Sequence, residues 1–125
     1  MKVVLVVDDH AASREAFLAF LDCEGYQGIG AADAAQAFDY LRSTAAPSLI
    51  VLDLMLPEMS GAEFADRLKD DPSLSSIPIL VYSAGPNVPE VVATMGAAGG
   101  LRKPASLPEL IDAVERCTNG NPRGK

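Results

Sequence analysis

The chain has 125 residues, a length typical of one domain, and 49% of them are hydrophobic and 22% charged, which excludes a disordered or fibrous protein. Ten Lys and Arg residues stand against seventeen Asp and Glu residues, so the formal net charge at pH 7 is −7. A surface of this sign repels phosphate backbones, which argues against direct nucleic-acid binding, and it favours cationic partners, including metal ions.

The first apolar run, residues 3–7, predicts a buried strand and not a targeting or membrane segment. It is far too short to cross a bilayer, and Asp8 and Asp9 end it where a signal peptide would lead to a cleavage site. The two cysteines, Cys23 and Cys117, are too few for a disulfide framework and lack the clustered partners of a zinc site. We therefore expect a cytoplasmic protein without membrane association, in which both cysteines are reduced and lie on the buried sides of their elements.

Short apolar runs alternate with helical patterns along the whole chain. In chain order, strands are predicted at residues 3–7, 26–31, 49–52, 77–82 and 97–102. The first, third and fourth are continuous β-branched runs, typical of strands buried on both faces, whereas the second and fifth are rich in Gly and Ala.

Each predicted strand is followed by an amphipathic pattern with helical spacing. The first helix is predicted to end at Gly25, the third to begin at Ser60, the fourth near Pro89 and the fifth at Ser106. The buried faces are predicted to contain Phe17, Phe20 and Leu21 in the first helix, Ala37, Phe38 and Leu41 in the second, Phe64 and Leu68 in the third, Val91, Val92 and Met95 in the fourth, and Leu107, Leu110, Ile111, Val114 and Cys117 in the fifth.

Five alternating strand–helix units predict an α/β fold with a doubly wound, five-stranded parallel sheet, in the flavodoxin-like order 2-1-3-4-5, and five helices on its two faces. We expect residues 1–118 to form this domain. Residues 119–125 contain Gly, Pro and two basic residues and are interpreted as a flexible tail or linker stub.

Polar residues follow four of the predicted strands. The first strand ends in Asp8-Asp9, the third in Asp53 and the fourth in Ser83, and Lys103 follows the fifth. Ligands of open parallel sheets bind beyond the carboxyl ends of the strands, so these side chains are expected to meet at one edge.

Three carboxylates held close together repel one another, and a hard cation such as Mg²⁺, bound by oxygen atoms alone, relieves that repulsion. Lys103 and Ser83 add a positive charge and a hydroxyl donor, which are groups that phosphoryl transfer needs. Asp53 is the candidate nucleophile.

At these residues the sequence resembles the receiver domain of bacterial two-component response regulators. The resemblance covers residues 3 to about 118, and it is carried by the segments Val7-Asp8-Asp9-His10, Leu52-Asp53-Leu54-Met55-Leu56-Pro57 with Ser60-Gly61, Tyr82-Ser83-Ala84 and Arg102-Lys103-Pro104.

The resemblance implies a signalling switch and not a conventional enzyme. Asp53 matches the phosphoacceptor, which takes a phosphoryl group from a histidine kinase or a phosphotransfer protein. Ser83 matches the hydroxyl residue that turns toward the phosphoryl group, and Lys103 matches the invariant lysine, whose bond to Pro104 is similar to one that is cis in the family.

The resemblance also implies a Mg²⁺ site. Asp9 matches the direct metal ligand, Asp8 the acidic partner that acts through water, and Asp53 with the backbone carbonyl of Met55 completes the protein ligands. The implied output is a change in contacts with a downstream protein target or a tethered output domain, through the fourth helix, the fifth strand and the fifth helix.

One position departs from the family pattern. Receivers commonly carry an aromatic switch residue three positions before the lysine, where this chain has Gly100. We therefore hypothesise that output is carried by backbone movement in residues 96–102.

Two other functions stay open from the sequence. The first is a receiver-like interaction module that signals without phosphorylation. The second is a true enzyme of the doubly wound class. A haloacid-dehalogenase-like phosphatase, however, needs a second Asp two residues after its nucleophile, where Met55 stands, and a dinucleotide protein needs a glycine-rich loop where this chain has Asp8-Asp9-His10.

Overall fold

The computed structural model describes residues 2–43 and 45–118, which form a three-layer α/β fold. Five strands, β1 (Val3–Val7), β2 (Gln27–Ala31), β3 (Leu49–Leu52), β4 (Ile79–Ser83) and β5 (Gly99–Arg102), pair in parallel in the order β2-β1-β3-β4-β5. The predicted fold class and strand order are therefore confirmed. The predicted tail, residues 119–125, lies outside the described residues.

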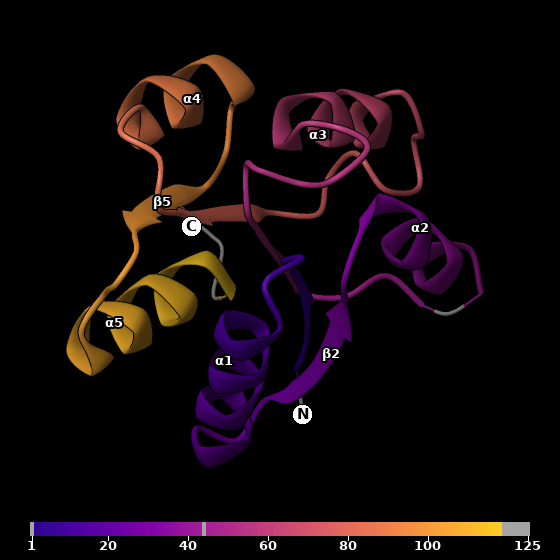
Figure 1. The fold of residues 1–125 in the computed structure, drawn as a ribbon. Coiled ribbons are helices and arrows are strands. Elements are labelled where there is room, and N and C mark those ends of the chain that lie inside the picture. The colour runs from indigo at the N-terminus through magenta and orange to yellow at the C-terminus, as the bar shows by residue number, and fades with distance from the viewer. Residues whose placement is uncertain (1, 44, 119–125) are drawn as a thin grey trace.

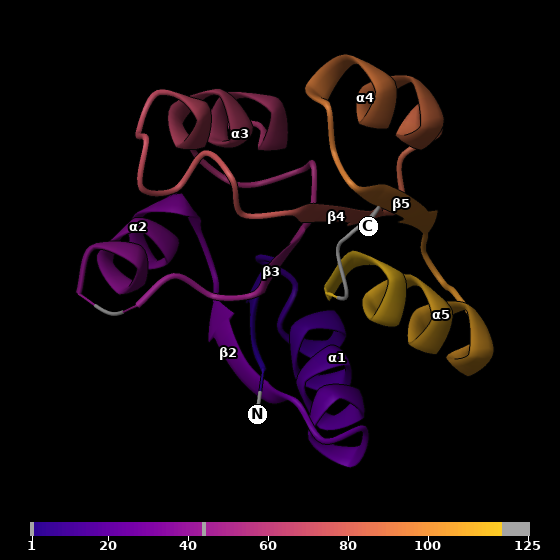
Figure 2. The ribbon, with the colours of Figure 1, turned by 180° about the vertical axis from the view of Figure 1, so that it is seen from behind.

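Five helices, formed by the described residues, cover the two faces of the sheet (Figures 1 and 2). They are α1 (Ala11–Cys23), α2 (Ala34–Ser43), α3 (Gly61–Lys69), α4 (Val88–Met95) and α5 (Leu107–Thr118). Helices α1 and α5 lie on one face, and α2, α3 and α4 lie on the other. None of the helices among the described residues is both long and apolar enough to pass through a bilayer.

The sheet separates two hydrophobic clusters, because successive strand residues point to opposite faces. One cluster lies under α2, α3 and α4, with Phe64 fully buried at its centre. The other lies under α1 and α5 and contains the buried side chains of Phe17, Leu21 and Val114. The helices thus fix both faces of the sheet and leave its carboxyl edge free.

Local signals set most helix ends as predicted. Gly25 has a φ of 85°, and the amide of Tyr26 returns to the Leu21 carbonyl to close α1. Ser60 and Glu63 form a capping box at α3, and Ser106 and Glu109 exchange the corresponding hydrogen bonds at α5. Helix α4 begins one residue before Pro89, which occupies its first turn.

Strands β2, β4 and β5 begin one or two residues later than predicted. The backbone amides at the predicted starts donate hydrogen bonds outside the sheet. The Tyr26 amide closes α1, and the Ala97 amide donates to Val92 at the end of α4. The Ile77 amide donates back to Leu74 in a turn, and Pro78 has no amide, so the β4 ladder begins at Ile79.

Two predicted burials are wrong. Cys117 is buried, but Cys23 is exposed at the last residue of α1. Leu107 is 62% exposed, because it is the first residue of α5 and lines an open groove between α1 and α5, whereas Ala113 lies on the buried face of that helix.

Candidate functional site

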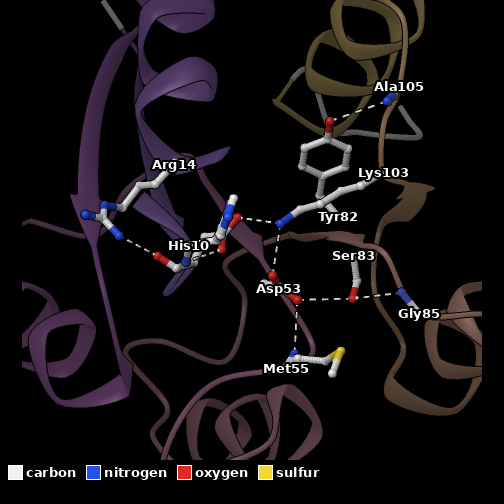
Figure 3. A network of polar contacts seen from close by, with 10 residues as sticks. His10, Arg14, Asp53, Met55, Tyr82, Ser83, Gly85, Lys103 and Ala105 are labelled. Atoms are coloured by element: carbon white, nitrogen blue, oxygen red, sulfur yellow. Dashed lines mark hydrogen bonds and ion pairs between the residues drawn. The ribbon is translucent and has the colours of Figure 1, made fainter. Parts of the chain in front are cut away.

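Four of the predicted site residues lie at the carboxyl edge of the sheet, each held by the neighbouring strand. The amide of Asp8 donates to Ala31 at the end of β2, and the amide of Asp53 donates to Val7 of β1. The amide of Lys103 donates to Ser83, the last residue of β4. Because these bonds extend the parallel ladders by one residue, side chains far apart in the sequence converge at one place (Figure 3).

The three predicted carboxylates form one cluster. Asp8, Asp9 and Asp53 each offer an oxygen, and these oxygens lie within 4.8 Å of one another. Asp8 is 4% exposed and Asp53 7% exposed, whereas Asp9 is exposed. The cluster opens into a cleft of about 630 Å³, lined by Asp9, His10, Ser13, Asp53, Met55, Tyr82, Ala84, Lys103 and Pro104.

Lys103, which also lines the cleft, forms ion pairs with two of these carboxylates. Its ammonium nitrogen lies 2.6 Å from Oδ2 of Asp8 and 3.0 Å from Oδ2 of Asp53. The Lys103–Pro104 peptide bond is cis, as the resemblance implied. The sequence placed Lys103 in the site but did not predict that it would pair with Asp8, 95 residues away.

This pairing changes the acid–base properties of both partners. Burial alone would raise the pKa of Asp8, but hydrogen bonds from Lys103 and from the His10 amide outweigh burial and lower it below its ordinary value. Burial alone would lower the pKa of Lys103, but its hydrogen bonds to Asp8 and Asp53 outweigh burial and raise it. At neutral pH, Asp8 is therefore ionised and Lys103 is protonated.

The carboxylate of Asp53 is held by three donors. Its Oδ1 accepts the Ser83 hydroxyl at 3.1 Å and the Met55 amide at 3.0 Å, while Oδ2 accepts Lys103. Ser83 is fully buried, and the Gly85 amide approaches its hydroxyl oxygen at 3.5 Å. Met55 is 68% exposed and lines the cleft, and its backbone amide contacts Asp53.

Two residues at the site were missed by the sequence reasoning or assigned only a packing role. The Arg14 guanidinium on α1 donates to the Asp8 carbonyl at 2.8 Å, which holds the acidic loop against the helix. Tyr82, expected only to pack in the sheet, lies beside Lys103 at the cleft wall. The only sequence signal that Arg14 belongs to the site is its position in the first turn of the helix that follows Asp8-Asp9, and this signal is weak.

The donor set fits a small divalent cation. Three carboxylates and one ammonium leave a net charge of −2, and all the candidate ligand atoms are oxygens, which Mg²⁺ prefers. Asp8, Asp9 and Asp53 would hold the ion. The backbone carbonyl of Met55 stays a prediction as the fourth protein ligand.

The position of the missing switch aromatic, Gly100, is covered by α4. A side chain there would collide with Val88 and Val92, so the structure has no space for an aromatic ring at that point. The predicted backbone movement in residues 96–102 stays a prediction.

Comparisons with known proteins agree with this site. The model of the response regulator receiver domain matches residues 4–115. The polar-differentiation response regulator DivK of Brucella anthropi is 31% identical over 116 residues, which cover 91% of this chain and 94% of DivK.

Solved structures are similar over nearly the whole chain. The Vibrio cholerae chemotaxis protein CheY4 superimposes with a TM-score of 0.84 at 28% identity, covering 94% of this chain and 98% of CheY4. The Thermotoga maritima response regulator TrrA, crystallised with Mg²⁺ and BeF, superimposes with a TM-score of 0.83 at 26% identity, covering 94% of this chain and 99% of TrrA.

Proposed function

The chain belongs to the response regulator receiver domain family, whose members act in phosphoacceptor signalling, and on that premise we propose the individual roles of its site residues. Asp53 is the phosphoacceptor, and Lys103 and Ser83 are the side chains that stabilise the transferred group. Asp8, Asp9, Asp53 and the Met55 carbonyl hold Mg²⁺. The proposal is carried by one observation, the three donors that hold the Asp53 side chain at the cleft.

The reaction needs little chemistry from the protein beyond positioning and charge. A carboxylate oxygen of Asp53 attacks the phosphorus atom of a phosphohistidine. The P–N bond breaks, and its electron pair stays on the imidazole nitrogen, which takes up a proton. Mg²⁺ held by the acidic cluster would supply positive charge to the phosphoryl oxygens. Lys103, which pairs with Asp8 and Asp53, supplies a second positive charge.

Receiver domains interact with histidine kinases, and we propose a kinase or a phosphotransfer protein as the donor for this chain. The phosphoryl group carries a charge of about −2 and strong acceptors, which would draw Ser83 and Lys103 toward it. We propose that this movement changes contacts with a downstream protein or an attached output domain, in the cytoplasm.

The test is acetyl phosphate with Mg²⁺, followed by intact-mass measurement. We expect the mass of one phosphoryl group to be added to the wild type and not to Asp53→Asn. The matched control is Asp66→Asn, which removes an exposed carboxylate on α3 and should leave phosphorylation unchanged. On addition of beryllofluoride with Mg²⁺, the wild type and Asp66→Asn should show NMR shifts, and Asp53→Asn should show none.

Two outcomes would contradict the proposal. Phosphorylation of Asp53→Asn at the wild-type rate would place the acceptor elsewhere. No response of the wild type to acetyl phosphate, to beryllofluoride or to any histidine kinase tested would favour the interaction module that signals without phosphorylation.

A further inference from the structure

Tyr82 of β4 forms the wall between the acidic cleft and a second hollow. Its side chain lines the cleft beside Asp53 and Lys103, and it also lines a groove of about 250 Å³ between α1 and α5. It belongs to the cluster under α1 and α5, whereas the next residue, Ser83, bonds to Asp53. The strand alternation thus gives two adjacent residues different contacts at one site.

The Tyr82 ring is held in place from two directions. Its centroid lies 5.4 Å from that of the buried Phe17 ring on α1, at an interplanar angle of 64°, an edge-to-face contact. Its hydroxyl oxygen accepts the Ala105 amide at 3.4 Å, just after Pro104 (Figure 3). The ring is therefore fixed to α1 on one side and to the loop that carries Lys103 on the other.

The Lys103 ammonium lies over this ring. Its nitrogen is 5.5 Å from the Tyr82 centroid, within the range in which the negative face of an aromatic ring attracts a cation. The ammonium has three donors, and the carboxylates of Asp8 and Asp53 accept from it. The ring adds a third contact to the same charged group, and this contact is not a hydrogen bond.

We propose that Tyr82 is a positioning residue for phosphoryl transfer, which acts through Lys103. This inference rests on the proposed function. In transfer, the ammonium must exchange its contact with the Asp53 carboxylate for one with a phosphoryl oxygen. A hydrogen bond would resist that displacement because it is directional, whereas attraction to a ring face persists as the ammonium slides across it.

Positioning of this kind matters because a lysine side chain has many rotamers. Fixing it in one conformation costs conformational entropy. The ring removes one side of the space that Lys103 can explore, so the ammonium is already near the point where the phosphoryl oxygens will be. The expected effect is on the rate of transfer and not on the binding of the phosphodonor.

The experiment compares Tyr82→Phe and Tyr82→Leu in phosphorylation by acetyl phosphate at saturating Mg²⁺. We expect Tyr82→Leu to lower the maximal rate roughly tenfold, with little change in the half-saturating acetyl phosphate concentration. Tyr82→Phe keeps the ring, so its rate should stay within about threefold of wild type. A Tyr82→Leu rate equal to that of wild type, or a Tyr82→Phe rate as low as that of Tyr82→Leu, would overturn the inference.

A double-mutant comparison separates positioning from packing. In a Lys103→Met background, Tyr82→Leu should cause no further loss of rate, because its effect passes through the ammonium. Equal losses in both backgrounds would assign the effect to packing and overturn the inference. As a spectroscopic check, the Lys103 side-chain NMR signals should lose their ring-current shift in Tyr82→Leu and keep it in Tyr82→Phe.

Failure of this inference is distinguishable from failure of the proposed function. If the wild type takes up phosphoryl at Asp53 while the Tyr82 variants match it, only the inference fails. If the wild type takes up none, the proposed function itself fails, whatever the Tyr82 variants do.

Discussion

Gly100 of β5 lies directly against Val92 of α4, so that a Cβ atom at Gly100 would come within 2.5 Å of the Val92 Cγ2 atom. The same Cβ atom would lie 2.8 Å from Cγ1 of Val88. Helix α4 therefore packs on the backbone of β5 at a point where a side chain would separate them.

Gly100→Ala should destabilise the fold, because α4 must move or repack to make room. We expect a loss of about 1–3 kcal/mol in the free energy of unfolding, measured by urea denaturation. The matched control is Gly99→Ala, whose Cβ would make an ordinary contact 3.5 Å from Cys117 and should change stability by less than about 0.5 kcal/mol. If the two variants were equally stable, α4 would not be in the close contact described.

Ser83→Ala should separate phosphorylation from the response to it. Asp53 keeps its bonds from Met55 and Lys103, so the variant should still be phosphorylated by acetyl phosphate. The buried hydroxyl that joins Asp53 to the Gly85 amide is lost, so the amide signals of residues 84–86 should shift less on phosphorylation than in wild type. Wild-type shifts in Ser83→Ala would show that the loop senses the phosphoryl group by another route.

Lys103→Met should strengthen Mg²⁺ binding while it slows phosphorylation. The ammonium pairs with two of the three carboxylates, so it competes with a cation for the same oxygens. Removing one positive charge a few ångström from the ion should raise affinity roughly tenfold or more, measured by calorimetry. Lys69→Met makes the same charge change on the exposed end of α3 and should have little effect. Weaker binding in Lys103→Met would contradict the assigned ligand set.

The capping box of α5 predicts a pH dependence. Hydrogen bonds from the Ser106 amide and hydroxyl lower the pKa of Glu109 below its ordinary value of 4.5. A carboxylate with a lowered folded-state pKa contributes stability above pH 4.5, and that contribution is lost as pH falls through the folded-state pKa. The melting temperature of wild type should therefore fall more than that of Glu109→Gln as pH drops below about 4.5. If the melting temperatures of the two proteins fell equally as pH drops below about 4.5, this assignment would be contradicted. Glu115→Gln, on the same helix, is the control and should behave like wild type.

Much of the fold and site could be predicted from the sequence, because both depend on local patterns: apolar runs that form buried strands and the polar residues that follow them. Buried parallel strands are continuous apolar runs, and the residues that follow Val7 and Leu52 must lie at the same edge of the sheet. Asp8, Asp53 and Lys103 could therefore be brought together without coordinates. The strand order followed from the alternation of strands and helices and from the few topologies open to a doubly wound sheet.

The rest depended on contacts that no local pattern contains. Whether the Ile77 amide joins a ladder or a turn is decided by its bond to Leu74, and the exposure of Leu107 is decided by where α5 begins relative to α1. The Lys103–Tyr82 contact depends on side-chain directions across two strands. Sequence spacing alone could not distinguish that contact from ordinary sheet packing.

The pairing of Asp8 with Lys103 spans 95 positions, and it joins the first strand of the sheet to the residue after the last. A nascent chain that has released only its first four strands from the ribosome carries all three acids without their cationic counterpart. The charge balance of the acidic cluster is thus complete only once β5 has joined the sheet, so assembly of the acceptor site and docking of the last strand are coupled.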